Sequence, residues 1–137
     1  MNTSGYSGTP LAKKLGIKEG YRIALINTPD YYFRLFTDFP QVKQVNDPKE
    51  KKDFIHFFTT EAEQLAHHIK TLKEQLVPNG MLWVSWPKKA SKVPTDITED
   101  TVRILALQHG LVDVKVCAVD EVWSGLKLVI PVKERKG

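Results

Sequence analysis

The chain has 137 residues, of which 42% are hydrophobic and 26% charged, with a formal net charge of +4. This length suits a single compact domain over residues 1–137, and no apolar run approaches the roughly 20 residues that cross a bilayer, so no membrane partner is expected. A single cysteine, Cys117, excludes an internal disulfide and fits the reducing cytoplasm, where we expect the protein.

The first elements predicted in chain order are a short helix and a strand. Residues 1–8 have no basic or apolar leader pattern and are expected to form a flexible segment. Pro10 at a first helical position and Gly16 after the last apolar residue predict a short helix between them. Residues 21–27 follow as the first strand of a wound sheet.

A second pair of capping residue and proline, Thr28-Pro29, predicts another helix that continues through Phe36. This helix carries five large apolar or aromatic side chains, which leaves room for homodimerisation if one face is exposed. Residues 42–45 are a weaker strand candidate, and residues 46–52 form a charged loop.

Two nearly continuous apolar segments, residues 53–58 and 81–86, are typical of strands that are buried on both faces. Between them, Thr60 and Glu63 have the spacing of a capping box and begin the strongest helical pattern of the chain. Pro78-Asn79-Gly80 is expected to end that pattern before the next strand.

The last part of the chain predicts a helix and a β-hairpin. Thr98 caps the helix, which closes at His109-Gly110. Residues 112–118 and 126–130 then alternate between apolar and polar side chains around a Trp123-Ser124-Gly125 connection. Residues 133–137 are expected to form a flexible basic tail.

These elements predict an α/β fold with three layers and a Rossmann-like, mostly parallel sheet. Strands separated by helices pair in parallel, whereas the closing hairpin is antiparallel, which gives a proposed strand order of 2-1-3-4-6-5. Residues 76–84 and 110–114 resemble the stretches that lead Rossmann-type methyltransferases into a central strand and into their terminal hairpin. The resemblance implies a methyltransferase-like fold from which at least one N-terminal strand-helix unit is absent.

Three longer blocks resemble another family. The blocks SGTPLAKKLG (residues 7–16), MLWVSWPKKAS (81–91) and VCAVDEVWSGLK (116–127) are similar to a family of small bacterial proteins catalogued as a domain of unknown function. That resemblance implies a stand-alone cytoplasmic protein and brings no catalytic residues to this chain.

The loop after the first strand lacks the glycines of a nucleotide-binding domain. Asn27-Thr28-Pro29-Asp30 stands where bare backbone would approach a cofactor, and proline removes an amide donor. Asp47 is about 20 residues further on, where a ribose-binding acid belongs, although an ordinary loop acid is the alternative. The pattern favours a non-catalytic domain over an enzyme, with an S-adenosylmethionine-dependent methyltransferase of atypical cofactor site as the alternative.

The loop over residues 86–96 is the main candidate site, because ligands of open α/β sheets bind outside the carboxyl ends of the strands. It combines an aromatic ring with lysines and hydroxyls, which suits a small anionic ligand or a protein partner. The alternative is that Trp86 is a core residue and the lysines are solvated. The candidate ligand-binding residues are Trp86, Lys88, Lys89, Ser91 and Lys92 of this loop, with Asn27, Asp30, Thr59, Ser124 and Lys127 from other strand ends and the hairpin.

Other chemistries are disfavoured. No Gly-x-Ser-x-Gly motif surrounds a serine, so a serine hydrolase is not expected. Cys117 alternates with valines and is predicted to be a small buried residue. His67 and His68 diverge by about 100° on a helix, so no metal site is expected. The mild positive charge keeps nucleic-acid association through the lysine clusters as a further alternative.

Overall fold

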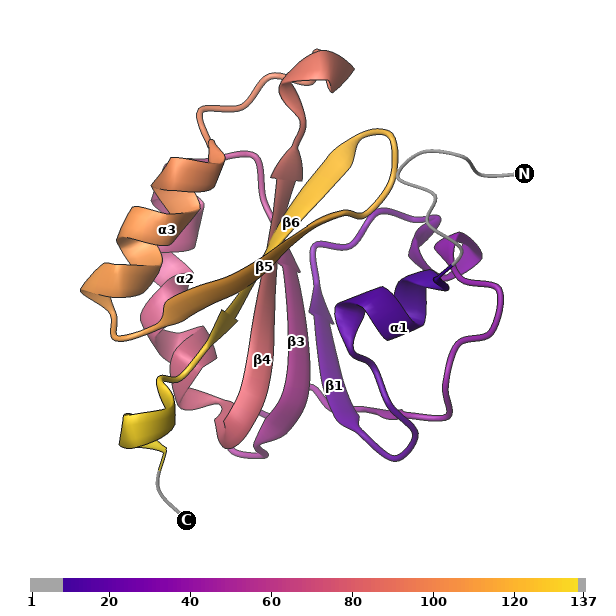
Figure 1. Ribbon diagram of the computed structural model, residues 1–137, viewed down its shortest axis with the longest axis vertical. Helices are drawn as coiled ribbons and strands as arrows, with labels where there is room; N and C mark the ends of the chain where they lie inside the picture. Colours follow the sequence, from indigo (N-terminus) through magenta and orange to yellow (C-terminus); the bar gives the residue numbers. More distant parts are fainter. Residues whose placement is uncertain (1–8, 136–137) are drawn as a thin grey trace.

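The computed structural model describes residues 9–135 as a six-stranded sheet between two helical layers (Figure 1). The segment 1–8 and residues 136–137, both predicted to be flexible, lie outside the described residues. The strands are β1 (Arg22–Ile26), β2 (Lys43–Gln44), β3 (Lys52–Phe58), β4 (Leu76–Pro87), β5 (Val112–Ala118) and β6 (Trp123–Val129).

The sheet order is β2-β1-β3-β4-β6-β5, as the sequence predicts. The first four strands of this order are parallel, and β6 and β5 run antiparallel to their neighbours. The C-terminal hairpin is therefore confirmed, and the fold is a mixed Rossmann-like sheet. Strand β1 lies between β2 and β3 in the sheet. The chain therefore first adds a strand next to β1 in one direction, at β2, and then continues the sheet in the other direction, from β3. This reversal of strand order creates a topological switch point between β1 and β3.

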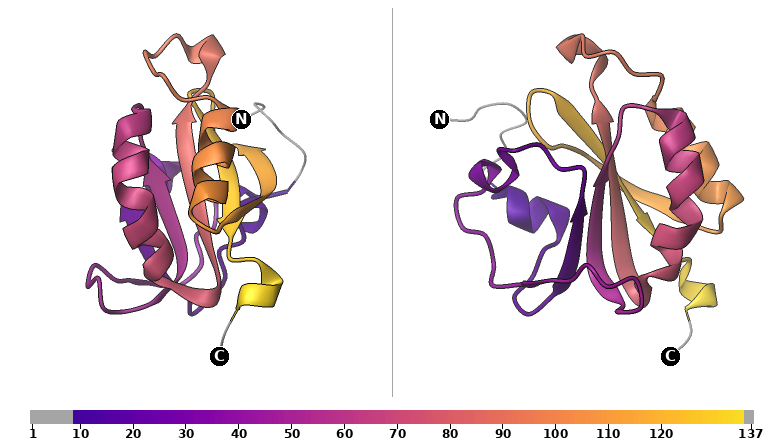
Figure 2. Two further views of the ribbon diagram at one scale, coloured as in Figure 1. Left: turned by 90° about the vertical axis from the view of Figure 1, so that its left-hand side faces the viewer. Right: turned by 180° about the vertical axis from the view of Figure 1, so that it is seen from behind.

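Helices cover both faces of the sheet (Figure 2). Helices α2 (Ala62–Glu74) and α3 (Glu99–Gln108) lie on one face, while α1 (Leu11–Leu15) lies on the other with the 3₁₀ helix η1 (Tyr32–Leu35). Two further 3₁₀ helices are η2 (Lys89–Ser91) and η3 (Val132–Glu134), and η3 overlaps the start of the predicted basic tail. No helix among residues 9–135 has the length and apolarity to span a membrane.

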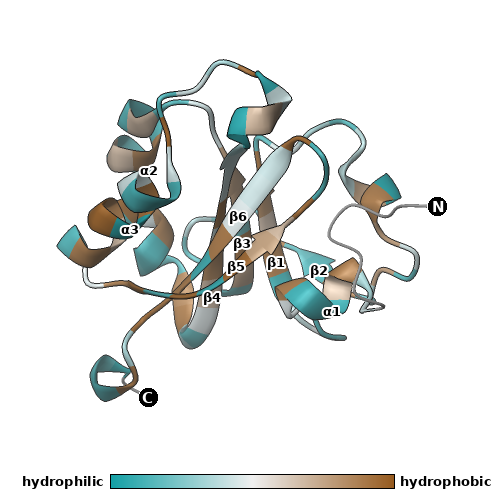
Figure 3. Cartoon of the chain, turned by 45° about the horizontal axis from the view of Figure 1, so that its top comes forward, coloured by the Kyte–Doolittle hydropathy of each residue, from teal (hydrophilic) through white to brown (hydrophobic). Residues whose placement is uncertain are grey.

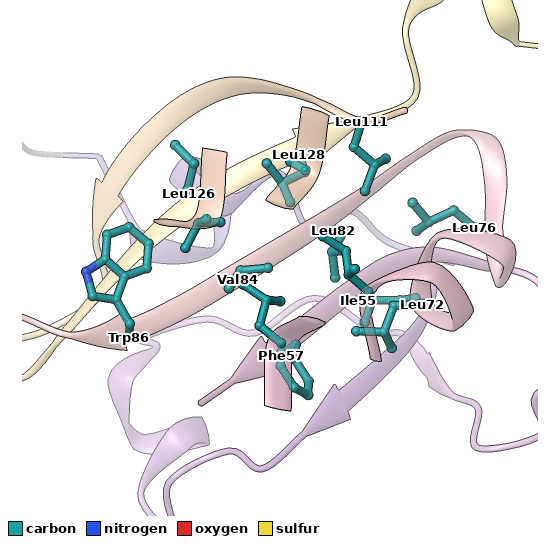
Figure 4. Packing of buried hydrophobic residues seen from close by; sticks show 14 of the residues in the cluster. Ile55, Phe57, Leu72, Leu76, Leu82, Val84, Trp86, Leu111, Leu126 and Leu128 are labelled. Atoms are coloured by element: carbon teal, nitrogen blue, oxygen red, sulfur yellow. The ribbon is translucent and has the colours of Figure 1, made fainter. Parts of the chain in front are cut away.

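Each face of the sheet has its own hydrophobic core. Ile55, Leu82 and Val84 belong to the cluster beneath α2 and α3 (Figure 4), whereas Phe54 and Trp83 belong to the cluster beneath α1. This division follows from the alternation of side chains along a strand. Coloured by hydropathy, the central strands are mainly hydrophobic and the exposed helices are mixed (Figure 3).

The prediction of a helix from Thr28 to Phe36 is wrong in helix type and in length: the segment forms only the four-residue 3₁₀ helix η1. Aromatic residues are mediocre helix formers, and tertiary packing decides this segment. Tyr32 is 1% exposed and its ring packs edge-on against Phe58, with the ring centroids 5.8 Å apart. Phe33, by contrast, is 48% exposed.

The start of α2 also differs from the prediction. Glu61 is the N-cap residue and no capping box with Thr60 forms. The backbone N–H of Ala62 instead donates to the Asp96 carboxylate at 2.8 Å, so the cap comes from a distant loop. A sequence window cannot contain such a partner, whereas the local capping box between Thr98 and Thr101 at the start of α3 does form.

Two strands are longer than predicted. Strand β4 includes Pro78-Asn79-Gly80, and β6 includes Trp123-Ser124-Gly125. At Gly80 a Cβ would lie 3.0 Å from the carbonyl oxygen of Lys52, so glycine permits a close approach to β3. Gly80, which the sequence suggested as part of a turn, therefore allows β4 to pack closely against β3.

Candidate functional site

A polar cavity of about 370 Å³ lies at the carboxyl ends of β1 and β3. We call it the carboxyl-edge pocket; it is lined by Asn27, Phe58, Thr59, Thr60, Glu61, Gln64 and Trp123. Its position is the switch point of the sheet, where open α/β folds bind ligands. Asn27 and Thr59, both predicted site residues, are brought together here.

Asn27 takes the place of a glycine in the loop after β1. Its φ of 58° is in the left-handed region, which asparagine tolerates better than most residues. Its side-chain amide donates to the Phe58 carbonyl at 3.2 Å and so links the ends of β1 and β3. The loop therefore keeps a glycine-like backbone turn and adds a polar side chain to the pocket wall.

Two hydrogen bonds, one local and one to a neighbouring strand, hold Thr59 in the pocket wall. The Thr59 hydroxyl accepts from the Glu61 backbone N–H at 3.1 Å, and the Thr59 N–H donates to the Ser85 carbonyl at 3.0 Å. Across the rim, the Thr95 hydroxyl donates to the Thr60 carbonyl at 2.6 Å. The loop after β4 is thus tied to the mouth of the pocket.

The electrostatic character of the pocket is acidic and aromatic. Among the described residues that line it, Glu61 is the one with a charged side chain. The rings of Phe58 and Trp123 meet edge to face, with centroids 5.0 Å apart. Phe58 is buried, so Trp123 is the partly exposed ring of the pair. A carboxylate and an aromatic ring in one pocket favour a cationic ligand group over an anionic one.

The turn before β6 orients Trp123. The Asp120 carboxylate accepts from the backbone N–H groups of Val122 at 2.8 Å and Trp123 at 2.7 Å. Burial, followed by a hydrogen bond to Asp120, raises the pKa of Tyr31 to about 12, so its hydroxyl stays protonated. The turn and its tryptophan are therefore held rigidly at the edge of the sheet.

A buried row of hydrogen-bonded side chains, Tyr32, His56 and Ser85, lies on the same face of the sheet as Phe58 and Trp123. The His56 Nδ1 atom is 2.9 Å from the Tyr32 hydroxyl, and its Nε2 atom is 2.7 Å from the Ser85 hydroxyl. His56 is fully buried, and desolvation lowers its pKa to about 3, which keeps the imidazole neutral. Sequence reasoning identified His56 as buried but missed its partners, although Ser85 is the polar interruption in the neighbouring apolar strand.

Trp86 is a core residue, which is the alternative that the sequence left open for this loop. Its side chain is 6% exposed and packs with Val84 and Leu126 in the core beneath α2 and α3 (Figure 4). The Ser91 hydroxyl donates to the Lys88 carbonyl at 2.7 Å, so it stabilises the η2 turn. Lys89 and Lys92 are exposed on this loop, and Lys92 has a φ of 63°.

The two hairpin residues, Lys127 and Ser124, lie on opposite faces of the sheet and so do not belong to one site. Lys127 lies opposite Trp83 in the β4–β6 ladder, whereas Ser124 lies opposite Trp86. The rings of Trp83 and Trp86 belong to the cores on opposite faces, so Lys127 and Ser124 also face opposite sides. Asp30 is exposed in the loop after β1 and does not line the carboxyl-edge pocket.

Asp47 does not reach the carboxyl edge, contrary to the ribose-binding alternative. Its carbonyl oxygen accepts from the Lys52 ammonium at 2.7 Å, and Lys52 is the first residue of β3. Because β2 has only two residues, the chain turns back at the amino end of the sheet. Asp47 is an ordinary loop acid whose side chain accepts from the Lys49 backbone N–H.

Neither a metal site nor an exposed thiol is found in the described part of the chain. No group of three or more His, Cys, Asp or Glu side chains among residues 9–135 is arranged to hold a metal ion. Cys117 is 7% exposed, as predicted, and burial raises the pKa of its thiol.

The fold is shared with solved methyltransferase structures. A protein from Sulfolobus solfataricus described as a type 11 methyltransferase is 16% identical, matches over 93% of both chains and has a TM-score of 0.64. An S-adenosylmethionine-dependent methyltransferase from Aquifex aeolicus is 15% identical over 88% of both chains, with a TM-score of 0.57. The magnesium protoporphyrin IX methyltransferase of Synechocystis, solved with bound S-adenosylmethionine, is 9% identical, with a TM-score of 0.54 over 88% of this chain and 74% of that one.

The chain therefore has the fold of Rossmann-type methyltransferases. No family model and no curated protein sequence matches it, so the resemblance to small bacterial proteins of unknown function stays a prediction. At sequence identities of 9–16%, the likeness to the solved structures shows the fold alone.

The residues present fit one end of S-adenosylmethionine and not the other. Glu61 and the partly exposed Trp123 ring suit the sulfonium and ammonium charges of its methionine part. The adenosine part finds neither the glycine loop nor a ribose-binding acid after β2.

Proposed function

We propose that the protein is an S-adenosylmethionine-dependent methyltransferase with an atypical cofactor site in the carboxyl-edge pocket. The observation that carries the proposal is the place and charge of this pocket: it lies at the switch point, and its lining includes the acidic residue Glu61 and the partly exposed Trp123. The shared fold with solved methyltransferases supports it further. Asn27 would contact the ligand where a glycine loop is absent.

The test is isothermal titration calorimetry with S-adenosylmethionine and with its demethylated product, S-adenosylhomocysteine. The two differ in the positive charge on sulfur, so an acidic pocket binds S-adenosylmethionine more tightly. A partly exposed charge contact contributes about 1 kcal/mol, so Glu61→Gln weakens S-adenosylmethionine binding about fivefold. A contact with the sulfonium leaves the affinity for the product unchanged, whereas a contact with the ammonium group, which the product keeps, weakens both ligands. Absence of binding to the wild-type protein at millimolar concentration overturns the proposal.

Glu63→Gln is the matched control for this experiment. Glu63 is also exposed, lies in the first turn of α2 and does not line the pocket. Both substitutions remove one negative charge near the same helix end, so they alter the helix dipole interaction in the same sense. A loss of affinity that is equal in both variants would show a general charge effect rather than a contact with Glu61.

A second candidate is a non-catalytic domain that binds a small anion or a protein partner through the loop over residues 86–96. The replacement of the glycine loop by Asn27-Thr28-Pro29 favours it, because methyl transfer in this fold depends on cofactor binding. With Trp86 in the core, the lysines carry this candidate alone. Replacing Lys88 and Lys89 by alanine then abolishes citrate or phosphate binding at unchanged thermal stability, and unchanged binding excludes the loop.

A further inference from the structure

A second cavity, on the opposite side of the hairpin from α3, has the reverse charge. We call it the lysine pocket; it measures about 380 Å³ and is lined by Thr9, Lys13, Lys14, Lys115, Val116, Cys117 and Ala118. Helix α1 contributes two of its lysines and strand β5 the third. None of the described lining residues is acidic.

The third lysine is held in position rather than free to turn away. The Lys115 ammonium donates to the Lys14 carbonyl oxygen at 2.8 Å, a contact between residues 101 positions apart in the chain. This hydrogen bond joins β5 to the last turn of α1 and places the Lys115 charge at the pocket wall. An ammonium has three donors, so Lys115 keeps further donors for a ligand.

The positive charge continues along the hairpin. Lys127 lies directly opposite Lys115 in the β5–β6 ladder, and like charges opposite one another destabilise a sheet. Burial lowers the pKa of Lys127, and the nearby Lys115, Arg135 and Lys18 lower it further. This arrangement costs stability in the free protein, and an anion bound at Lys115 in the lysine pocket would relieve part of that cost.

We propose that the lysine pocket binds a phosphate group, carried by a phosphorylated small molecule or by the backbone of a nucleic acid. Lysine ammonium groups bind phosphate as point charges, and the Thr9 hydroxyl at the rim supplies a neutral donor. The site is distinct from the carboxyl-edge pocket in position and in the sign of its charge. It does not depend on the proposed methyltransferase function.

Calorimetry with three probes tests the site: inorganic pyrophosphate, adenosine monophosphate and a single-stranded DNA of twelve nucleotides, each at low salt. Lys115→Ala and Lys13→Ala are each expected to weaken binding at least fivefold, because each removes one cation from the pocket wall. Both side chains are exposed, so thermal unfolding checks that the variants stay folded. Lys70→Ala is the matched control, because Lys70 is exposed on α2, on the opposite face of the sheet. This substitution is expected to leave the affinity for the probes unchanged.

Cys117 supplies a second readout that reports the place of binding. It is the one cysteine of the chain and it lines the pocket. Because burial hides the thiol and raises its pKa, alkylation by the uncharged reagent iodoacetamide is slow and is followed at alkaline pH; it slows further when the pocket is filled. Protection by pyrophosphate or adenosine monophosphate identifies a small phosphorylated ligand. Binding and protection by the oligonucleotide alone, with affinity that falls steeply as salt rises, identify a nucleic-acid backbone.

Two results overturn the proposal. One is the absence of a calorimetric signal with all three probes at low salt. The other is binding that Lys70→Ala weakens as much as Lys115→Ala does, because the attraction would then come from the net charge of the protein.

Discussion

Burial of His56 makes the protein sensitive to mild acid. In the unfolded chain the imidazole takes up a proton near pH 6.5, whereas in the folded protein its pKa is lowered to about 3. The neutral histidine therefore contributes stability that is fully present above pH 6.5 and is lost as the pH falls toward 3. From pH 6.5 to pH 5 the loss is about 2 kcal/mol, at about 1.4 kcal/mol for each pH unit.

The assay is urea unfolding between pH 7 and pH 5, with thermal unfolding beside it. For a domain of this size 2 kcal/mol corresponds to roughly 6–8 °C in Tm. His56→Gln keeps a donor and an acceptor between Tyr32 and Ser85; the variant is less stable, but its stability changes little over this range. Exposed His67 provides the control, because His67→Gln retains the acid sensitivity. A wild-type unfolding free energy that is constant from pH 7 to pH 5 would refute the reasoning.

Three substitutions test local packing by urea unfolding. Gly125→Ala places a Cβ 3.0 Å from the Ser85 hydroxyl and is expected to destabilise by about 1–3 kcal/mol through overpacking. Thr98→Ala removes the cap of α3 and costs about 1 kcal/mol, whereas an unchanged midpoint would show that the cap is dispensable. Asn27→Ala removes the hydrogen bond to the Phe58 carbonyl and puts alanine in a left-handed conformation, so the free energy of unfolding falls by about 1–2 kcal/mol. Asn27→Gly is expected to be less destabilising, because glycine adopts this conformation without strain.

The sheet could be predicted because its signals are local and redundant. Buried parallel strands such as β3 are continuous apolar runs, and the rules for crossovers leave few orders for the remaining strands. The predicted hairpin and strand order are both observed. The missed features depend on contacts between distant residues: Asp96 caps α2, and Tyr32 draws η1 onto the sheet.

The candidate site was predicted in part for the same reason. From the rule for open α/β sheets, Asn27 and Thr59 were expected at the carboxyl edge of the sheet, and both line the pocket there. Asp47 lies instead near the amino end of β3, because β2 is too short to carry the chain to the carboxyl edge. Trp83 and Trp86 are three residues apart, so a strand places them on opposite faces, but both faces are covered and neither ring is available to a ligand. Glu61 gave no sequence signal because its role arises from the pocket around it.

The two pockets together make a prediction that neither makes alone. The carboxyl-edge pocket carries a negative charge at Glu61, and the lysine pocket carries positive charges on the hairpin and α1. The two pockets share no lining residue, and physiological salt screens exposed charges beyond about 8 Å, so each variant should act on its own ligand. Glu61→Gln is expected to weaken the binding of S-adenosylmethionine and to leave the affinity for pyrophosphate unchanged. Lys115→Ala is expected to weaken the binding of pyrophosphate and to leave the affinity for S-adenosylmethionine unchanged. A shared loss in either variant would mean that the two ligands compete for one site.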